Sequence, residues 1–167
     1  RFGCGRSWGA WALALGLSAC GTWQSQPVSS PQTSVSGVAY ALSPQKRHDV
    51  VLQAMAMLDR NYSYGGKKLH TGFDCSGLVS FVYQESAGVR ITGSAADMAR
   101  QTRAIDAAQA SPGDLVFFNT LGSSFSHVGI YIGDGKFIHA ENEKTGVKTS
   151  SMKASYWARR FEGFRAL

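Results

Sequence analysis

The stretch SHVGIYIGDGKFIHA, residues 126–140, contains two apolar runs separated by the tripeptide GDG at 133–135. Turn-forming glycine and aspartate between two such runs predict a β-hairpin, with strands over 126–132 and 136–140. One face of this hairpin is entirely apolar, so we expect it to face the core. Its members are Val128, Ile130, Ile132, Ile138 and Ala140.

The opposite face of the hairpin carries two histidines. If residues 133–135 form a three-residue loop, Gly129 lies opposite His139, and His127 lies two positions along on the same face. Such a diagonal pair is about 7 to 8 Å apart at the backbone, which lets two imidazoles meet. A two-residue loop would shift the strand pairing by one residue and place the two histidines on opposite faces of the hairpin. The simpler alternative is that each histidine is a solvated strand residue.

A second informative stretch is GFDCSGLV, residues 72–79, in which a cysteine lies between small polar residues. Asp74 suits an N-cap, and the apolar residues after it predict a buried helix from Cys75 to a stop at Gly88. The first turn of a helix stabilises an anion, which lowers the pKa of a thiol placed there. An isolated cysteine is otherwise most simply a packing residue. A thiolate at Cys75 with an imidazole nearby would be a nucleophile for acyl chemistry.

These motifs together resemble the NlpC-type cell-wall cysteine peptidases, which have a papain-like fold. The resemblance covers the chain from Lys46 to its C-terminus and includes DCSG at 74–77, HVGIYIGDG at 127–135 and FIHA at 137–140. It implies an α+β fold in which N-terminal helices pack on a central antiparallel sheet.

The resemblance also implies roles for individual residues. Cys75 would be the nucleophile, His127 the general base and acid, and His139 the polar third residue that orients His127. Tyr62 matches the tyrosine of a Tyr-x-x-Gly-Gly motif that lies beside the nucleophile. The backbone N–H of Cys75 could stabilise an oxyanion at the helix N-terminus, together with the Tyr62 hydroxyl.

Further residues match the walls of the substrate cleft. Asp74 and Ser76 occupy positions that help to line it. Residues 91–98 (ITGSAADM) depart from the family's commoner Leu-Pro-Arg-Thr-Thr or Ser pattern, because they lack the proline. Ser94 still predicts a capping box that opens a helix to Arg103.

The other elements are predicted from periodicity and turn signals. Apolar residues at helical spacing predict an amphipathic helix over 47–60, with Val51, Ala54, Met55 and Leu58 facing the core. Strands are expected at 115–118, 147–151 and 161–167, with a short helical turn at 154–159. The two remaining histidines, His48 and His70, are expected to be exposed.

The first 19 residues are typical of a bacterial export signal. Two arginines precede an apolar run at 8–17, which is shorter than the roughly 20 residues that a membrane-spanning helix needs. The sequence LSAC at 17–20 resembles the lipobox of bacterial lipoproteins, in which a cysteine becomes the lipid-modified first residue. We expect Cys20 to carry that lipid. The alternative is an ordinary cleaved signal.

Residues 20–45 are uncharged and rich in Ser, Gln and Pro, which predicts a flexible tether. The tether leads to the predicted peptidase domain at 46–167. Its mean span of roughly 25 to 30 Å would allow attachment to the periplasmic face of the outer membrane with contact to the wall. Cys4 is removed with the signal, so Cys75 is expected to be the free thiol of the mature protein.

Composition restricts the classes of function. The chain has 167 residues, 44% of them hydrophobic, which fits a single core. Lysine and arginine number 17 against 11 aspartate and glutamate residues, a mild basic excess. No basic run alternates with aromatic residues and no zinc-ligand spacing occurs, so nucleic-acid binding is not expected.

The resemblance implies a peptidoglycan endopeptidase that cleaves stem peptides or their cross-links through an acyl-enzyme. Stem peptides are the expected partner, the protein is expected to be a monomer, and neither a cofactor nor a metal is expected. Three alternatives remain: an amidase or acyltransferase of the same fold, a non-catalytic wall-binding module, and a metal site at Cys75, His127 and His139. The metal site lacks a carboxylate or second cysteine at ligand spacing.

Overall fold

The structure, a computed structural model, describes residues 41–167, so the predicted signal peptide, Cys20 and most of the predicted tether lie outside it. Its helices are α1 (Pro44–Ala56), α2 (Cys75–Ala87), α3 (Ala95–Gln101) and α4 (Ser155–Ala158), with a 3₁₀ turn at Ala107–Gln109. Its strands are β1 (Lys67–Lys68), β2 (Gly72–Phe73), β3 (Arg103–Ile105), β4 (Leu115–Phe118), β5 (His127–Gly133), β6 (Lys136–Asn142), β7 (Gly146–Ser151) and β8 (Phe161–Ala166). None of these helices is long and apolar enough to cross a membrane.

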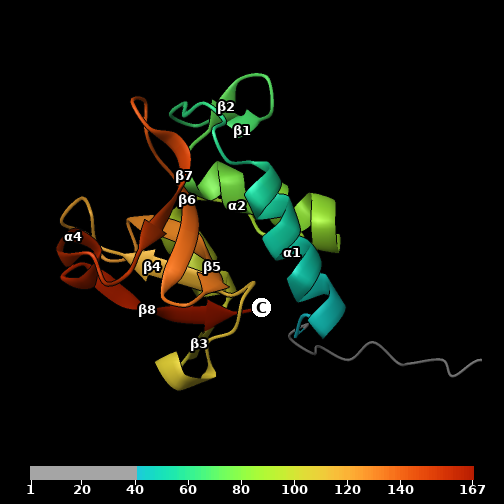
Figure 1. Cartoon of the computed structure of the whole chain (residues 1–167), viewed down its shortest axis with the longest axis vertical. Coiled ribbons are helices and arrows are strands. Elements are labelled where there is room, and N and C mark those ends of the chain that lie inside the picture. Colours follow the sequence, from blue (N-terminus) through green and yellow to red (C-terminus); the bar gives the residue numbers. More distant parts are fainter. Residues whose placement is uncertain (1–40) are drawn as a thin grey trace, which may run out of the picture. The chain divides into compact units, whose positions relative to one another are not determined.

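Six strands form one antiparallel sheet in the order β3-β8-β4-β5-β6-β7, while β1 and β2 pair separately. Helix α2 packs against β5 and β6, and α1 packs against α2 and β5 (Figure 1). A second apolar cluster holds Trp157 of α4 together with Phe118 and Phe137 of the sheet. The fold is therefore α+β, with N-terminal helices on a central antiparallel sheet, as predicted.

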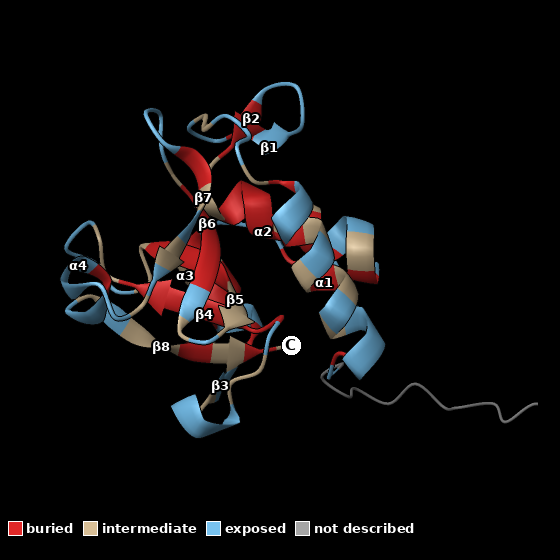
Figure 2. Cartoon of the chain, in the orientation of Figure 1, coloured by how far each residue is buried: buried red, intermediate tan, exposed pale blue. Residues whose placement is uncertain are grey.

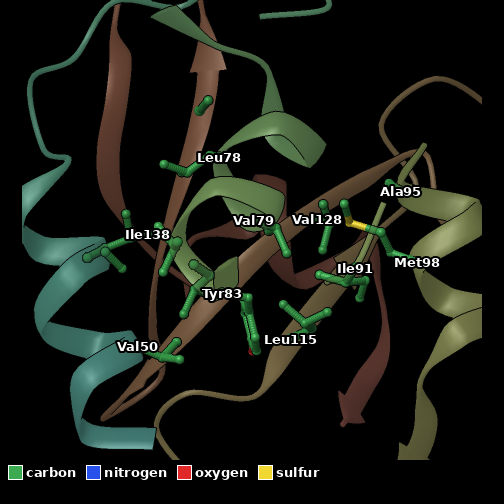
Figure 3. Close-up of a cluster of buried hydrophobic side chains, with 14 of the residues drawn as sticks. Val50, Leu78, Val79, Tyr83, Ile91, Ala95, Met98, Leu115, Val128 and Ile138 are labelled. Atoms are coloured by element: carbon green, nitrogen blue, oxygen red, sulfur yellow. The ribbon is translucent and has the colours of Figure 1, made fainter. Parts of the chain in front are cut away.

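The main core lies between the helices and the sheet. Leu78, Val79 and Tyr83 of α2 gather with Leu115 of β4 and Val128 of β5, and each is at most 1% exposed (Figure 3). Burying one such aliphatic side chain contributes about 1.5 to 3 kcal/mol. Buried residues are concentrated in α2 and the central strands, whereas α1 is buried along one side only (Figure 2). Helix α2 is thus anchored along its length, which fixes the position of its first turn.

Helix α1 begins earlier than the predicted range 47–60. Ser43 is its N-cap and accepts a hydrogen bond from the backbone N–H of Lys46 at 3.3 Å. Proline in the first helical turn suits this start, because it has no N–H to leave unpaired. Leu42 is only 7% exposed and packs in the core. The end of the predicted tether, residues 42–45, therefore belongs to the folded domain.

The buried stripe of α1 is also displaced from the prediction. Val50, Ala54 and Met57 are buried, whereas Met55 is 44% exposed. The apolar residues of this helix fit a helical spacing in more than one phase, and contact with α2 and β5 selects one of them.

Helix α3 has the predicted start and an earlier end. Ser94 and Asp97 form the capping box, each side chain accepting from the other's backbone N–H. The helix stops at Gln101 and not at Arg103, because Arg103 begins β3, which pairs with β8. Tertiary strand pairing overrides the local helical preference here.

Candidate active site

The β5–β6 hairpin has the predicted pairing but not the predicted loop. Ile130 pairs with Ile138 and Tyr131 with Phe137, a register that places Gly129 opposite His139. Gly133 pairs with Lys136, so the turn has two residues, Asp134 and Gly135. Their φ angles are positive, 52° and 67°, as a tight hairpin turn requires. A bulge between Tyr131 and Gly133 takes up the extra residue and restores the register.

Both faces of this hairpin are buried. The apolar face packs into the main core, as predicted, and the face that carries His127 and His139 is covered by the second cluster. His127 is 7% exposed and His139 is fully buried, which excludes two solvated strand residues. The Trp157 ring lies 4.7 Å from that of His139 and 5.4 Å from that of His127, measured between centroids. The two imidazoles therefore lie in an aromatic environment largely shielded from water.

The histidines form a directed chain of hydrogen bonds. His127 Nε2 lies 2.8 Å from His139 Nδ1, and His139 Nε2 lies 2.9 Å from Ser150 Oγ. Because Nε2 of His127 is engaged, its remaining ring nitrogen, Nδ1, is the one available as a base. For that, His127 must carry its proton on Nε2 and donate it to His139, which in turn donates from Nε2 to Ser150. The arrangement can hold His127 in one tautomer and one orientation.

Burial decides the charge of these imidazoles. It lowers the pKa of His127 to about 4, although the negative charges of Glu141 and Asp74 act in the opposite direction. It lowers the pKa of His139 to about 2, with the nearby charges of His127 and Lys148 adding to the effect. Both rings are therefore neutral at neutral pH, the state in which His127 can accept a proton.

Cys75 is the first residue of α2, with Asp74 as N-cap, as predicted. The backbone N–H of Val128 is hydrogen-bonded to its sulfur, which brings the thiol to the start of β5, one residue from His127. The predicted direction of the thiol pKa is wrong. Burial raises the pKa of Cys75 to about 11 and outweighs the N–H groups of Val128 and Ser76, which lower it. The resting group is therefore a neutral thiol.

Asp74 organises the backbone around the cysteine. Its carboxylate accepts from the N–H of Gly77 at 2.6 Å, the N–H of Gly65 at 2.9 Å and the hydroxyl of Ser76 at 3.0 Å. These bonds tie the Tyr-x-x-Gly-Gly segment to the first turn of α2. Tyr62 pairs with Phe73, two residues before Cys75, and its pKa is raised by burial and then by the negative charge that Cys75 would carry as a thiolate.

Two cavities meet at these residues. The first, which we call the Cys75 cavity, has a volume of about 630 Å³ and is lined by Cys75, Asp74 and Ser76. Its far wall is made by residues 93–96, the segment that lacks the family's proline, and by the loop 121–126. The second, the His127 cavity, has a volume of about 530 Å³ and is lined by His127, Glu141 and Trp157 among others. Leu121, which is 80% exposed, lines both.

The remaining predicted residues take no part in this site. His48 and His70 are exposed, as expected. Within residues 41–167, no group of three His, Cys, Asp or Glu side chains is arranged to hold a metal, so Cys75, His127 and His139 do not form one.

Sequence reasoning missed Ser150 and Trp157. In the β6–β7 pairing His139 lies opposite Lys148, so residue 150 lies two positions along on the same face. The diagonal construction used for the two histidines would have found Ser150. Trp157 comes from a short helix that follows the sheet strands in sequence, and no local pattern indicated where that helix would pack.

Comparison with known proteins gives consistent matches. The profile of the NlpC/P60 family matches residues 59–166. The chain is 36% identical over 131 residues to murein DD-endopeptidase MepH of Escherichia coli K12, covering 76% of this chain and 48% of that protein. It is 36% identical over 110 residues to the bifunctional muramidase/DL-endopeptidase CwlT of Bacillus subtilis 168, covering 65% of this chain and 32% of the other.

A solved structure agrees with these sequence matches. A Staphylococcus aureus Mu50 protein, described as similar to lipoprotein, NLP/P60 family, superposes with a TM-score of 0.67 at 28% identity, covering 78% of this chain and 44% of the other. The chain spans about half or less of the length of these relatives.

Proposed function

The chain belongs to the NlpC/P60 family, and we propose that it is a cysteine peptidase that hydrolyses peptide bonds of peptidoglycan, in stem peptides or their cross-links. One observation supports this most strongly: His127 heads a hydrogen-bonded row with His139 and Ser150, and the next residue along β5, Val128, donates its backbone N–H to the thiol of Cys75 on the first turn of α2. The names of the relatives, a murein DD-endopeptidase and a DL-endopeptidase, support the substrate class.

In the proposed mechanism, Cys75 gives its proton to Nδ1 of His127 and its sulfur attacks the carbonyl carbon. The oxyanion that forms is stabilised by the backbone N–H of Cys75 and the hydroxyl of Tyr62. His127 then transfers the proton to the leaving amine as the C–N bond breaks, which leaves an acyl-enzyme. Water, deprotonated by His127, then attacks the carbonyl carbon of this thioester, the C–S bond breaks to release the carboxyl product, and His127 returns the proton to the sulfur.

Burial favours this sequence of proton transfers. Each group alone resists ionisation, because a single charge is poorly solvated in the site. Proton transfer from Cys75 to His127 creates two opposite charges together, and they stabilise each other strongly in a medium of low polarity. Nδ1 of His139 accepts a hydrogen bond from the Nε2–H of the resulting imidazolium and so stabilises its charge, as the third group of such triads does. The thiolate would therefore form when the substrate is bound and not beforehand.

The activity should persist to an unusually low pH. The pKa of His127 is lowered from 6.5 to about 4, so the pair of Cys75 and His127 gains an extra proton only when the pH falls to about that value. The acid limb of kcat/KM is therefore expected between about pH 4 and 5. Rates measured from pH 4 to 9 test this, with circular dichroism at each pH to separate inactivation from unfolding. An acid limb at or above pH 6.5 would mean that burial does not lower the pKa of His127 in the active enzyme.

Ser150→Ala is expected to lower kcat about tenfold and to leave KM unchanged. Without the hydroxyl, Nε2 of His139 loses its acceptor, so the tautomer that places Nδ1 as acceptor for His127 is no longer enforced. Ser150 lines neither cavity, so substrate binding should be unaffected. Steady-state kinetics check this, and Ser150→Thr, which keeps a hydroxyl, should recover most of the rate. A rise in KM at constant kcat would assign Ser150 a different role.

We also propose the predicted attachment. Export under the signal at 1–19 and lipidation of Cys20 would place the domain on the periplasmic face of the outer membrane, where a tether lets a monomer reach the wall. The LSAC motif and the uncharged stretch after it support this. Metabolic labelling with a fatty acid, lost in a Cys20→Ala variant, is the corresponding test.

The function itself is tested by mass spectrometry of purified muropeptides before and after incubation with the protein. Hydrolysis predicts fragments whose combined mass exceeds the parent by one water, with heat-denatured protein as control. Products joined to an added amine in place of water would favour the acyltransferase. Retention on isolated sacculi without any new peptide would favour a wall-binding module.

A further inference from the structure

The far wall of the Cys75 cavity is made by two segments that are distant in sequence. Residues 93–96 lead into helix α3, and residues 121–126 belong to the loop between β4 and β5. In the proposed reaction the acyl carbon becomes bonded to Cys75, so the acyl portion of the substrate lies against this wall. The position of the two segments relative to each other therefore decides how well that portion fits.

Strand β8 contains a bulge at Glu162. The residues of β4 that pair with Phe161 and Gly163 are neighbours, so Glu162 is the extra residue between them. In a regular strand, residues three positions apart point to opposite faces, whereas an extra residue brings them to the same face. Phe161 and Phe164 show this, because their ring centroids are only 5.2 Å apart. The bulge likewise brings Glu162 and Arg165 to one face of the sheet.

Both of these charged residues contact Phe125 in the β4–β5 loop. The carboxylate of Glu162 accepts a hydrogen bond from the backbone N–H of Phe125. The guanidinium of Arg165 lies over the Phe125 ring, 5.0 Å from its centroid, which is within the range of a cation–π interaction. Phe125 has a φ of 54°, a conformation that a residue other than glycine keeps only where its surroundings impose it. The two β8 residues are among the contacts that impose it.

Arg165 also holds the other segment of the wall. Its Nη1 donates to the backbone carbonyls of Ala99 and Thr102, at 2.8 and 3.0 Å. These carbonyls lie at the C-terminal end of α3, where the last carbonyls of a helix lack intrahelical partners. One side chain of β8 therefore joins α3 to the β4–β5 loop, and Glu162 fixes the loop from the same strand.

We propose that Glu162 and Arg165, which we call the β8 clamp, are positioning residues that hold the β4–β5 loop and α3 in the relative position that binds the acyl portion of the substrate. In the part of the chain that the structure describes, the linings of the two cavities include neither residue, so the clamp acts through the segments it holds. The hydrogen bonds that orient His127 and Cys75 are made by other residues. Loss of the clamp should therefore weaken substrate binding and spare the chemical step. This role rests on the proposed peptidase function of the same site.

Steady-state kinetics with purified muropeptides test the clamp. Glu162→Ala removes the acceptor of the Phe125 N–H, so the loop should occupy its binding conformation for only part of the time. Apparent affinity falls by that fraction, so KM should rise about tenfold while kcat stays within about twofold of the parent value. Glu162→Gln keeps a carbonyl oxygen as acceptor and should bring KM back to within about threefold. Glu85→Ala, which removes an exposed carboxylate from α2, should change neither constant.

Hydrogen exchange measures the clamp without substrate. In Glu162→Ala the amide of Phe125 should exchange at least about tenfold faster than in the parent, whereas the amide of Ile130 within β5 should exchange at the parent rate. Arg165→Lys tests the clamp from its other residue, and does so even if Glu162→Ala does not fold. Lysine lacks the planar guanidinium that bonds two carbonyls while it covers a ring, so KM should rise about threefold.

The outcomes separate the clamp from the reaction. If folded Glu162→Ala keeps the KM of the parent, or loses kcat at constant KM, the positioning role is overturned while the peptidase stands. An unchanged exchange rate at Phe125 in that variant would also overturn it, and so would an unchanged KM in Arg165→Lys. If the parent cleaves no muropeptide, the peptidase function fails and the positioning role fails with it, whereas hydrogen exchange still shows whether Glu162 holds the loop.

Discussion

Cys75→Ala is expected to hydrolyse muropeptides at least about ten thousand times more slowly than the parent protein. The side chain of alanine cannot form the acyl-enzyme, and no other cysteine occurs among residues 41–167. His127 would remain as a base beside a bound peptide, but it would have no thiol to deprotonate. Chromatography measures the products that the variant forms over several hours. The parent is diluted until it forms product at the same rate, and the dilution factor then gives the ratio of the two activities.

The loss must be separated from unfolding. Alanine is a good helix former, so a substitution at the first residue of α2 should leave the thermal midpoint within a few degrees. Cys75→Ser keeps the shape and a hydrogen-bonding atom at the sulfur position, and should be nearly as inactive because a hydroxyl is far harder to ionise. Substantial hydrolysis by either folded variant would show that another group attacks the substrate and would remove Cys75 from its proposed role.

The hairpin shows why the site was largely predictable. The positions of His127 and His139 depend only on strand alternation and on the register of one turn, both of which are local properties of residues 126–140. The prediction of a three-residue loop was wrong, and a bulge compensated for the shorter turn. A register that buries Ile130 and Ile138 on the core face is strongly favoured, and the backbone adjusted to keep it.

Predictions that depended on distant contacts were less successful. The phase of α1 is set by packing on α2 and β5, so the sequence pattern alone could not choose between Met55 and Met57 as the buried methionine. The end of α3 is set by the pairing of β3 with β8, which joins residues more than fifty positions apart. Periodicity indicates that a helix exists, whereas the side it buries is decided by its partners.

The thiol pKa of Cys75 is the most instructive error. The first turn of a helix does stabilise an anion, and backbone N–H groups from α2 and β5 do point at the sulfur. That the same sulfur is largely buried against Val128 depends on how β5 packs on α2, which no local pattern around Cys75 indicates. Burial and dipole act in opposite directions, and burial is the larger effect here. In the proposed mechanism, activation of the thiol therefore comes from His127 and not from the helix alone.

The close approach of the Tyr-x-x-Gly-Gly segment to the first turn of α2 depends on Gly77. The carbonyl of Gly66 accepts a hydrogen bond from the N–H of Asp74 at 3.1 Å and lies directly over Gly77. A Cβ atom at Gly77 would come within 1.9 Å of that carbonyl oxygen. Both atoms belong to the backbone or are attached directly to it, so no side-chain rotation can relieve the overlap.

Gly77→Ala is therefore expected to destabilise the protein by about 4 kcal/mol or more, even though alanine is favoured over glycine in a helix by about 1 kcal/mol. The segment from Tyr62 to Gly66 must move away from α2, so the remaining folded protein should also lose most of its activity. Urea unfolding followed by circular dichroism measures the stability. Gln84→Ala, an exposed substitution on the same helix, should change it by less than about 0.5 kcal/mol. A Gly77→Ala protein as stable as the parent would mean that Gly66 does not approach the helix this closely, and that the Tyr-x-x-Gly-Gly segment does not hold Tyr62 against the nucleophile.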